Sequence, residues 1–160
     1  MAKQKLLISE LFILLIFYSL KIYSQEVSVT DAGSFTASLN GKEITNPIRF
    51  GESDKIVSIA TGDETFTLTV NFNDIGSISE IKVGTTKFPA KDNSVTVLYL
   101  DNKMEMPSII TDGALTITEN NDKVLKGNLE FTASAGGVPK EMGGTEIKLS
   151  NGTFEIPKKK

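Results

Sequence analysis

The chain has 160 residues, with 17 basic (Lys, Arg) and 20 acidic (Asp, Glu) side chains, and it contains neither cysteine nor histidine. The lack of these two residue types excludes disulfides, Ser-His-Asp and Cys-His catalytic machinery, zinc sites with nitrogen or sulfur ligands, and haem held by histidine. We expect no enzyme, no catalytic residue, no cofactor and no metal site, and without cysteine we expect no lipid anchor.

The first 24 residues have the pattern of a signal peptide. Lys3 and Lys5 precede an apolar run of about ten residues, from 11 to 20, whereas a helix that spans a bilayer needs about 20. Ser24 is small and polar residues begin at Gln25, which predicts cleavage near this bond. We therefore expect an exported protein of the periplasm, the cell surface or the exterior, with no transmembrane span in the mature chain.

Removal of residues 1–24 leaves a mature chain with an acidic balance. Three lysines and one glutamate are lost, so 14 basic and 19 acidic residues remain, a net charge of −5. Such a surface repels phosphate backbones, and we expect no nucleic acid partner. Residues 25–157 are predicted to form one domain, which is long enough to bury a core without disulfides, and residues 158–160 a frayed basic tail.

Apolar residues alternate with polar ones from residue 33 onward, which predicts an all-β domain. The first hairpin is expected at Asn40-Gly41, because this dipeptide accepts the positive φ of a type I′ turn; the strand before it carries Phe35, Ala37 and Leu39. Pro47 interrupts the second arm of this hairpin, so this arm is predicted to be an edge strand or a bent one.

The clearest strand covers residues 65–72 and follows a predicted turn at 61–64. Its apolar face carries Phe66, Leu68, Val70 and Phe72. Polar residues occupy the opposite face, which indicates that one face meets a core and the other meets water. Further along, the apolar stretch from Met104 to Ile110 is expected in the core, with the lining of a pocket as the alternative.

A turn at 119–122 is predicted to join residues 115–118 to a strand over 123–133. Gly127 lies on the apolar face of that strand and indicates a bulge or a close approach of main chain. The glycine-rich stretch 134–145 is expected to form a loop at the rim of the domain.

The last hairpin is predicted at Asn151-Gly152. Its register opposes Ser150 with Thr153, Leu149 with Phe154, Lys148 with Glu155, and Ile147 with Ile156. This register places apolar pairs on one face and an opposite-charge pair on the other.

Strands at intervals of about ten residues, joined by short turns, predict about eight to ten strands in all. Two architectures fit: a single antiparallel up-and-down β-barrel and a two-sheet sandwich. The barrel is favoured slightly, because consecutive hairpins dominate and long crossover loops are scarce.

Several turn and core residues resemble those of a Bacteroidota family of small exported β-domains of unknown function, often lipoproteins. The resemblance rests on Phe35, Ala37 and Asn40-Gly41, on residues 115–118, Gly127 and 131–133, and on residues 151–154 with Pro157. It covers nearly all of the mature chain, although this chain lacks the lipidated cysteine of the family. The resemblance implies a calycin-like or lipocalin-like barrel and implies no activity.

Candidate functional residues are few. Most acidic residues lie in predicted turns, where aspartate forms local hydrogen bonds with the backbone, so catalysis by paired carboxylates is disfavoured. The oxygen-rich clusters at 71–74 and 120–122 do not match a calcium-binding loop. The candidate ligand-lining residues are Phe66, Leu68, Val70 and Phe131.

We therefore expect a non-enzymatic binding or accessory module of the bacterial envelope, with an unknown protein or a small apolar molecule as its partner. One alternative is a lipocalin-like carrier that holds a small apolar molecule inside the barrel. Another is a structural subunit that associates through the edges of its sheet.

Overall fold

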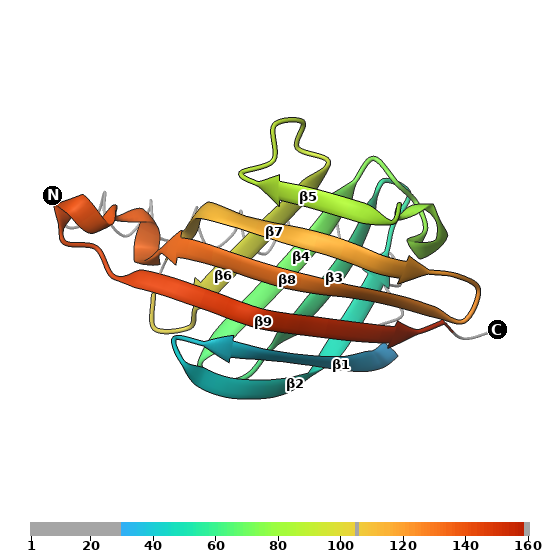
Figure 1. Cartoon of the computed structure of the whole chain (residues 1–160), viewed down its shortest axis with the longest axis horizontal. Coiled ribbons are helices and arrows are strands. Elements are labelled where there is room, and N and C mark those ends of the chain that lie inside the picture. Colours follow the sequence, from blue (N-terminus) through green and yellow to red (C-terminus); the bar gives the residue numbers. More distant parts are fainter. Residues whose placement is uncertain (1–29, 105, 159–160) are drawn as a thin grey trace, which may run out of the picture.

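The computed structural model describes residues 30–104 and 106–158 (Figure 1). The strands are β1 (Thr30–Leu39), β2 (Lys42–Glu52), β3 (Ile56–Gly62), β4 (Phe66–Asn73), β5 (Gly84–Phe88), β6 (Val95–Asp101), β7 (Ile109–Asn120), β8 (Val124–Ser134) and β9 (Glu146–Pro157). Three short 3-10 helices accompany them: η1 (Ile78–Glu80), η2 (Ala135–Gly137) and η3 (Lys140–Met142). No α-helix occurs among the described residues, and the all-β prediction is confirmed.

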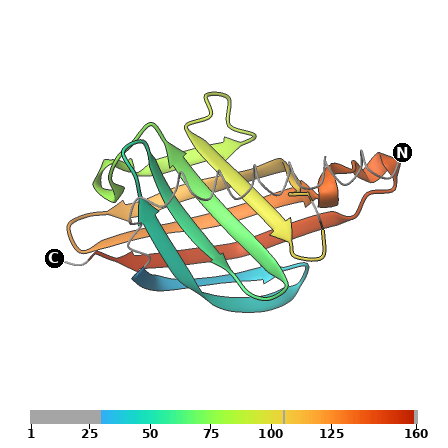
Figure 2. The same ribbon diagram turned by 180° about the vertical axis from the view of Figure 1, so that it is seen from behind.

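All nine strands belong to one antiparallel sheet in the order β5-β7-β8-β9-β1-β2-β3-β4-β6. The sheet curls into a nearly closed barrel, in which β2, β3, β4 and β6 cross behind β7, β8 and β9 (Figures 1 and 2). The predicted barrel is thus confirmed, with one departure from simple up-and-down order: β5 pairs with β7, and β6 returns to pair with β4. We call the opening between the two end strands, β5 and β6, the seam.

Three predicted turns are confirmed. Asn40 and Gly41 have φ angles of 51° and 81° and join β1 to β2. The turns at 61–64 and 119–122 join β3 to β4 and β7 to β8. The apolar face of β4 is buried as predicted, so the local pattern set both the strand and its orientation.

The predicted C-terminal hairpin is wrong, because residues 146–157 form the single strand β9 between β8 and β1. Asn151 has a positive φ of 53°, but it belongs to a β-bulge in which β9 carries one residue more than its neighbours. An Asn-Gly dipeptide satisfies such a bulge as well as a tight turn, because both need a residue with positive φ.

The bulge shifts the alternation of β9 by one residue, so Leu149 and Phe154 are both buried although they differ in parity. The predicted pairing of Lys148 with Glu155 does not form. Glu155 lies instead 3.2 Å from the Nζ of Lys126 on β8. The two halves of the segment face the same core as parts of one strand.

Two further expectations are corrected in part. Of the two alternatives for the arm with Pro47, the edge strand is wrong, because β2 lies between β1 and β3, and the bent strand is the one observed (Figures 1 and 2). Pairing with β3 begins only at Ile48, so the missing N–H of Pro47 leaves no gap in that ladder. Most of the apolar stretch 104–110 is outside the core: Met104, Met106 and Ile109 are exposed, and only Ile110 packs partly buried against the core.

Gly127 is buried on β8, directly opposite Phe154 of β9. A β-carbon at this position would lie 2.5 Å from the Cζ atom of Phe154 and 2.7 Å from the main-chain oxygen of Thr116. The expected close approach is confirmed, and it lets the aromatic ring cover the glycine.

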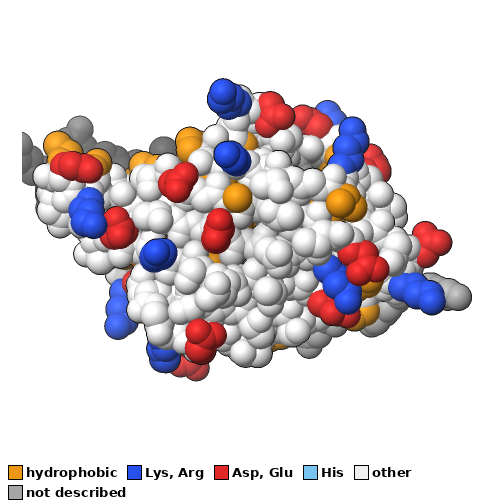
Figure 3. Space-filling view, viewed as in Figure 1, with side chains coloured by type: hydrophobic (Ala, Val, Ile, Leu, Met, Phe, Trp, Pro, Cys, Tyr) orange, Lys and Arg blue, Asp and Glu red, His pale blue; other side chains and the backbone are white. Residues whose placement is uncertain are grey.

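The outer face of β7, β8 and β9 is largely uncharged at its centre (Figure 3). Hydroxyl pairs link neighbouring strands on this face, with Thr85 and Thr116 at 3.0 Å and Thr36 and Thr153 at 2.7 Å between their Oγ1 atoms. The polar side chains alternate with the buried ones, as a sheet with one solvated face requires.

The predicted signal peptide lies outside the described residues. No helix in the described ranges is long and apolar enough to cross a membrane. At the other end, the main-chain N–H of Lys158 donates to the carbonyl of Lys123 at 2.8 Å, and residues 159–160 lie outside the described part.

Candidate functional site

The barrel interior is closely filled by side chains. A void of about 20 Å³ remains, enough for the centre of one water molecule. Its lining consists of Phe35, Ile48, Ile59, Thr61, Leu68, Val70, Leu115, Leu129 and Phe154. Of the four candidate ligand-lining residues, Leu68 and Val70 contact this void, and Phe66 and Phe131 do not.

Phe66 and Phe131 pack on Tyr99 of β6 instead. The ring centroids of Phe66 and Tyr99 are 5.8 Å apart with the planes at 15°, and those of Tyr99 and Phe131 are 6.0 Å apart at 58°. These distances are typical of favourable aromatic pairs. The two phenylalanines are therefore part of a packed aromatic cluster, which sequence alternation alone does not distinguish from a ligand wall.

Burial raises the pKa of the Tyr99 phenol above its ordinary value, and the nearby carboxylates of Asp101 and Asp63 raise it further. Since the folded pKa exceeds the unfolded one, the associated stability is complete below about pH 10 and is lost as the pH rises through the folded value. Tyr99 is the one tyrosine outside the predicted signal peptide. A near-ultraviolet titration of residues 25–160 should therefore show one phenol, with a higher midpoint in buffer than in urea; equal midpoints would contradict it.

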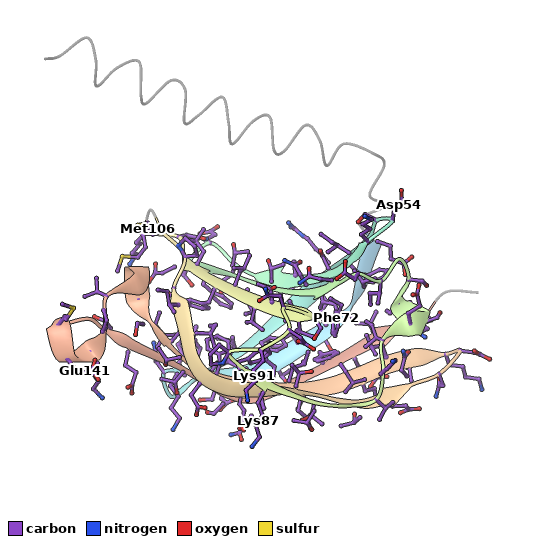
Figure 4. The ribbon with its side chains drawn as sticks, turned by 90° about the horizontal axis from the view of Figure 1, so that it is seen from above. Asp54, Phe72, Lys87, Lys91, Met106 and Glu141 are labelled. Atoms are coloured by element: carbon purple, nitrogen blue, oxygen red, sulfur yellow. The ribbon has the colours of Figure 1, made fainter. Side chains whose placement is uncertain are left out.

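The larger opening lies at the seam, where a cleft of about 450 Å³ separates the β6 side from the β5 side. We call it the seam cleft. Its floor carries the apolar side chains of Phe72, Ile81, Val95, Leu115 and Ile117, all of which are buried. Its rim carries Asn73, Ile75, Glu80, Lys82, Val83, Gly84, Thr85, Thr86, Asp92 and Ser94. Figure 4, viewed from above, shows Phe72 between the two layers of the barrel.

The seam cleft follows from the path of the chain. After β4 the chain crosses through η1 to the other layer, where β5 pairs with β7, and it then returns so that β6 pairs with β4. β5 and β6 are therefore left as the two unpaired ends of the sheet, on either side of the cleft. The Ser77 hydroxyl caps η1 by accepting from the N–H of Ser79 at 3.3 Å. The Nδ2 of Asn120 on β7 donates to the carbonyls of Ile78 and Ile81 at 3.0 and 2.6 Å. These bonds hold η1 at one end of the cleft, against β7.

A bridge between Tyr99 and Ser108 closes the other end of the seam, with the N–H of Ser108 donating to the Tyr99 carbonyl at 2.7 Å. The opening is therefore confined to the part of β6 that precedes Tyr99. Leu115 lines both the seam cleft and the interior void.

The acidic residues of the turns bond to their own backbone. Asp63 accepts from the N–H of Thr65 at 2.7 Å, Asp92 from that of Ser94 at 3.1 Å, and Asp101 from that of Lys103 at 2.9 Å. Bonds with Thr65 and Ser94 lower the pKa values of the Asp63 and Asp92 carboxyls. Within the described ranges no three acidic side chains gather as metal ligands. These carboxylates stabilise turns.

Hydrophobic side chains also gather at the end of the barrel where the β6–β7 and β8–β9 connections meet (Figures 3 and 4). We call this group the apolar tip. It consists of Met104, Met106, Ile109, Val138 and Met142, each at least 43% exposed. The two loops lie close together, since a β-carbon at Gly137 would be 3.4 Å from the Cδ1 atom of Ile109. The rim loop expected over 134–145 thus forms part of an exposed apolar surface.

Sequence reasoning missed both the seam cleft and the apolar tip. The floor of the cleft combines residues of β4, β6 and β7 with Ile81, which lie side by side only after the sheet has closed. The crowding of methionine and glycine in the two loops is the signal in the sequence that indicates the tip.

No protein-family model, curated protein or solved structure matches this chain.

Proposed function

We propose that this protein is an exported, non-enzymatic binding module of the bacterial envelope that holds its ligand in the seam cleft. The observation that carries the proposal is the cleft itself, whose volume of about 450 Å³ and buried apolar floor are typical of ligand sites. The signal-peptide pattern supports the exported location.

The chemistry of the cleft supports binding rather than catalysis. Its charged side chains, Glu80, Lys82 and Asp92, are all exposed at the rim, where water screens them. Its floor carries neither a nucleophile nor an ionisable group. The chain has no histidine or cysteine to supply one. The ligand is therefore expected to present apolar groups to the floor and polar groups to the rim.

The carrier alternative would place a small apolar molecule inside the barrel, where the void has a volume of about 20 Å³. A molecule of several carbon atoms would have to displace core side chains to enter. The cleft needs no such change, so we prefer it as the ligand site.

The test is native mass spectrometry of the mature protein, residues 25–160, isolated under mild conditions from the envelope of the bacterium that makes it, without refolding. We expect added mass on the wild-type protein and its loss from the Thr86→Trp variant. Thr86 is half-buried on the face of β5 that lines the cleft, opposite Leu115 of the floor, and an indole there is expected to fill the adjoining part of the cleft.

Lys87→Trp is the matched control, because Lys87 is the next residue of β5 and is exposed outside the cleft (Figure 4). It should retain the added mass. Loss of the mass from both variants, or from neither, would place the ligand elsewhere. A bare wild-type protein would also count against the cleft.

A further inference from the structure

We propose that the seam cleft takes an extended segment of a partner polypeptide, which adds to the sheet by pairing its main chain with the free edge of β6. This inference rests on the proposed function and names the class of ligand. The chemistry is that of strand addition: main-chain hydrogen bonds hold the segment, and alternate side chains enter the pocket beside the edge.

The register of β6 identifies the main-chain groups that are free to pair. The N–H of Asn73 donates to Ser94 and that of Asn102 donates to Thr65, so these pairs form the bonded positions of the ladder with β4. In an antiparallel pair the bonded positions alternate. Residues 94, 96, 98 and 100 therefore bond to β4, while Val95 and Val97 direct their N–H and C=O groups into the seam.

The two end strands of the sheet differ in how they are protected against pairing. Natural edges are blunted by shortness, lysine or proline. β5 has five residues, includes Lys87 and is followed by Pro89. β6 is longer, and its open part before Tyr99, residues 95–98 (VTVL), contains no charge, no proline and no glycine. A sequence of high β propensity is thus left open on one side, next to a cleft with an apolar floor.

The occupant is a single segment rather than the sheet of a second copy. The cleft is bounded on one side by Ser94 and Val95 and on the other by Gly84, Thr85 and Thr86 of β5. The edge strand of a second copy would bring its neighbouring strand into the space that β5 and β7 occupy. A free extended segment has no such neighbour, and its inward side chains would contact Phe72 and Ile117 on the floor.

The same register predicts which amides of β6 exchange fastest in the protein without a bound peptide. Amide hydrogen exchange of residues 25–160, followed residue by residue by NMR, should be faster at Val95 and Val97 than at Thr96 and Leu98 by more than about tenfold. Equal protection along the strand would show that the edge is already covered, and strand addition would then be ruled out.

The binding test uses the peptide Lys-Thr-Val-Thr-Val-Thr-Val-Thr-Lys. The control is a peptide of the same sequence with N-methylated main-chain amides, which cannot donate the hydrogen bonds of a β-ladder. We expect saturable binding of the first peptide with slowed exchange at Val95 and Val97, and no binding of the second. Thr86→Trp should abolish this binding and Lys87→Trp should retain it.

Two outcomes would overturn the inference. Shifts of Phe72 and Ile117 without slowed exchange at the edge would show that the cleft takes its ligand by another chemistry, and the proposed function would survive. Failure of the peptide to bind would rule out strand addition. The native mass spectra of the Thr86→Trp and Lys87→Trp variants would then decide separately whether the cleft is a ligand site.

Discussion

Replacement of Phe66 by alanine is expected to lower the free energy of unfolding by about 3 to 5 kcal/mol. Phe66 is 1% exposed, and its ring stacks on Tyr99 at 5.8 Å. Removal of the ring deletes buried apolar surface and leaves a cavity. The surrounding strands cannot move in to close it, because β4 is hydrogen-bonded to β3 and β6, and β6 is bridged to Ser108 beside the ring. The measurement is urea unfolding of the mature domain, monitored by circular dichroism.

The control is Leu98→Ala on β6, where the side chain is 43% exposed. It should change the free energy of unfolding by no more than about 0.5 kcal/mol. A cost below about 1 kcal/mol for Phe66→Ala would mean that the ring lines an open space rather than a packed core. That result would restore the interior of the barrel as a ligand site.

Replacement of Gly152 by alanine is expected to cost about 3 kcal/mol. Gly152 is buried in the bulge of β9, opposite Leu129. A β-carbon there would collide with the main-chain oxygen of Leu129 and lie 3.0 Å from the Cδ2 atom of Leu149. Because the obstacle is main chain of a central strand, relief requires a shift of β8 against β9. Urea unfolding measures this change directly.

Gly41→Ala provides the matched comparison, because Gly41 belongs to the other Asn-Gly dipeptide and lies in a real hairpin turn. Its φ is 81°, and a β-carbon there would meet no atom within 4 Å. Its cost should be limited to the strain of the left-handed conformation, about 1 kcal/mol. Equal costs at Gly41 and Gly152 would contradict the bulge and favour a turn at both sites.

The two Asn-Gly dipeptides show which structural features a local sequence can predict and which it cannot. At Asn40-Gly41 the prediction of a hairpin is confirmed, and at Asn151-Gly152 the same reasoning is wrong. In both places the dipeptide supplies a residue with positive φ. A hairpin and a bulge differ in whether the chain then folds back, which depends on the strands available on either side.

For the candidate ligand-lining residues, too, the sequence predicted one property and not another. Alternation correctly predicted that Phe66, Leu68, Val70 and Phe131 point into the barrel. Alternation reports only the orientation of a side chain, so it could not reveal that Tyr99 fills the space between Phe66 and Phe131. The core position predicted for Met104 and Met106 is wrong for a similar reason, since hydrophobic residues in a loop are buried only if another element covers them.

The sequence by itself determined the all-β class, the positions of several strands and turns, the face of those strands that meets the core, and the absence of histidine and cysteine chemistry. These properties depend on dihedral preferences and on the period of two, which act over a few residues. The tertiary structure alone decided that β9 continues through its Asn-Gly, that β5 and β6 exchange neighbours, and that a cleft opens between them. Each of these depends on pairing between strands distant in sequence, where the gain from closing the sheet outweighs local preference.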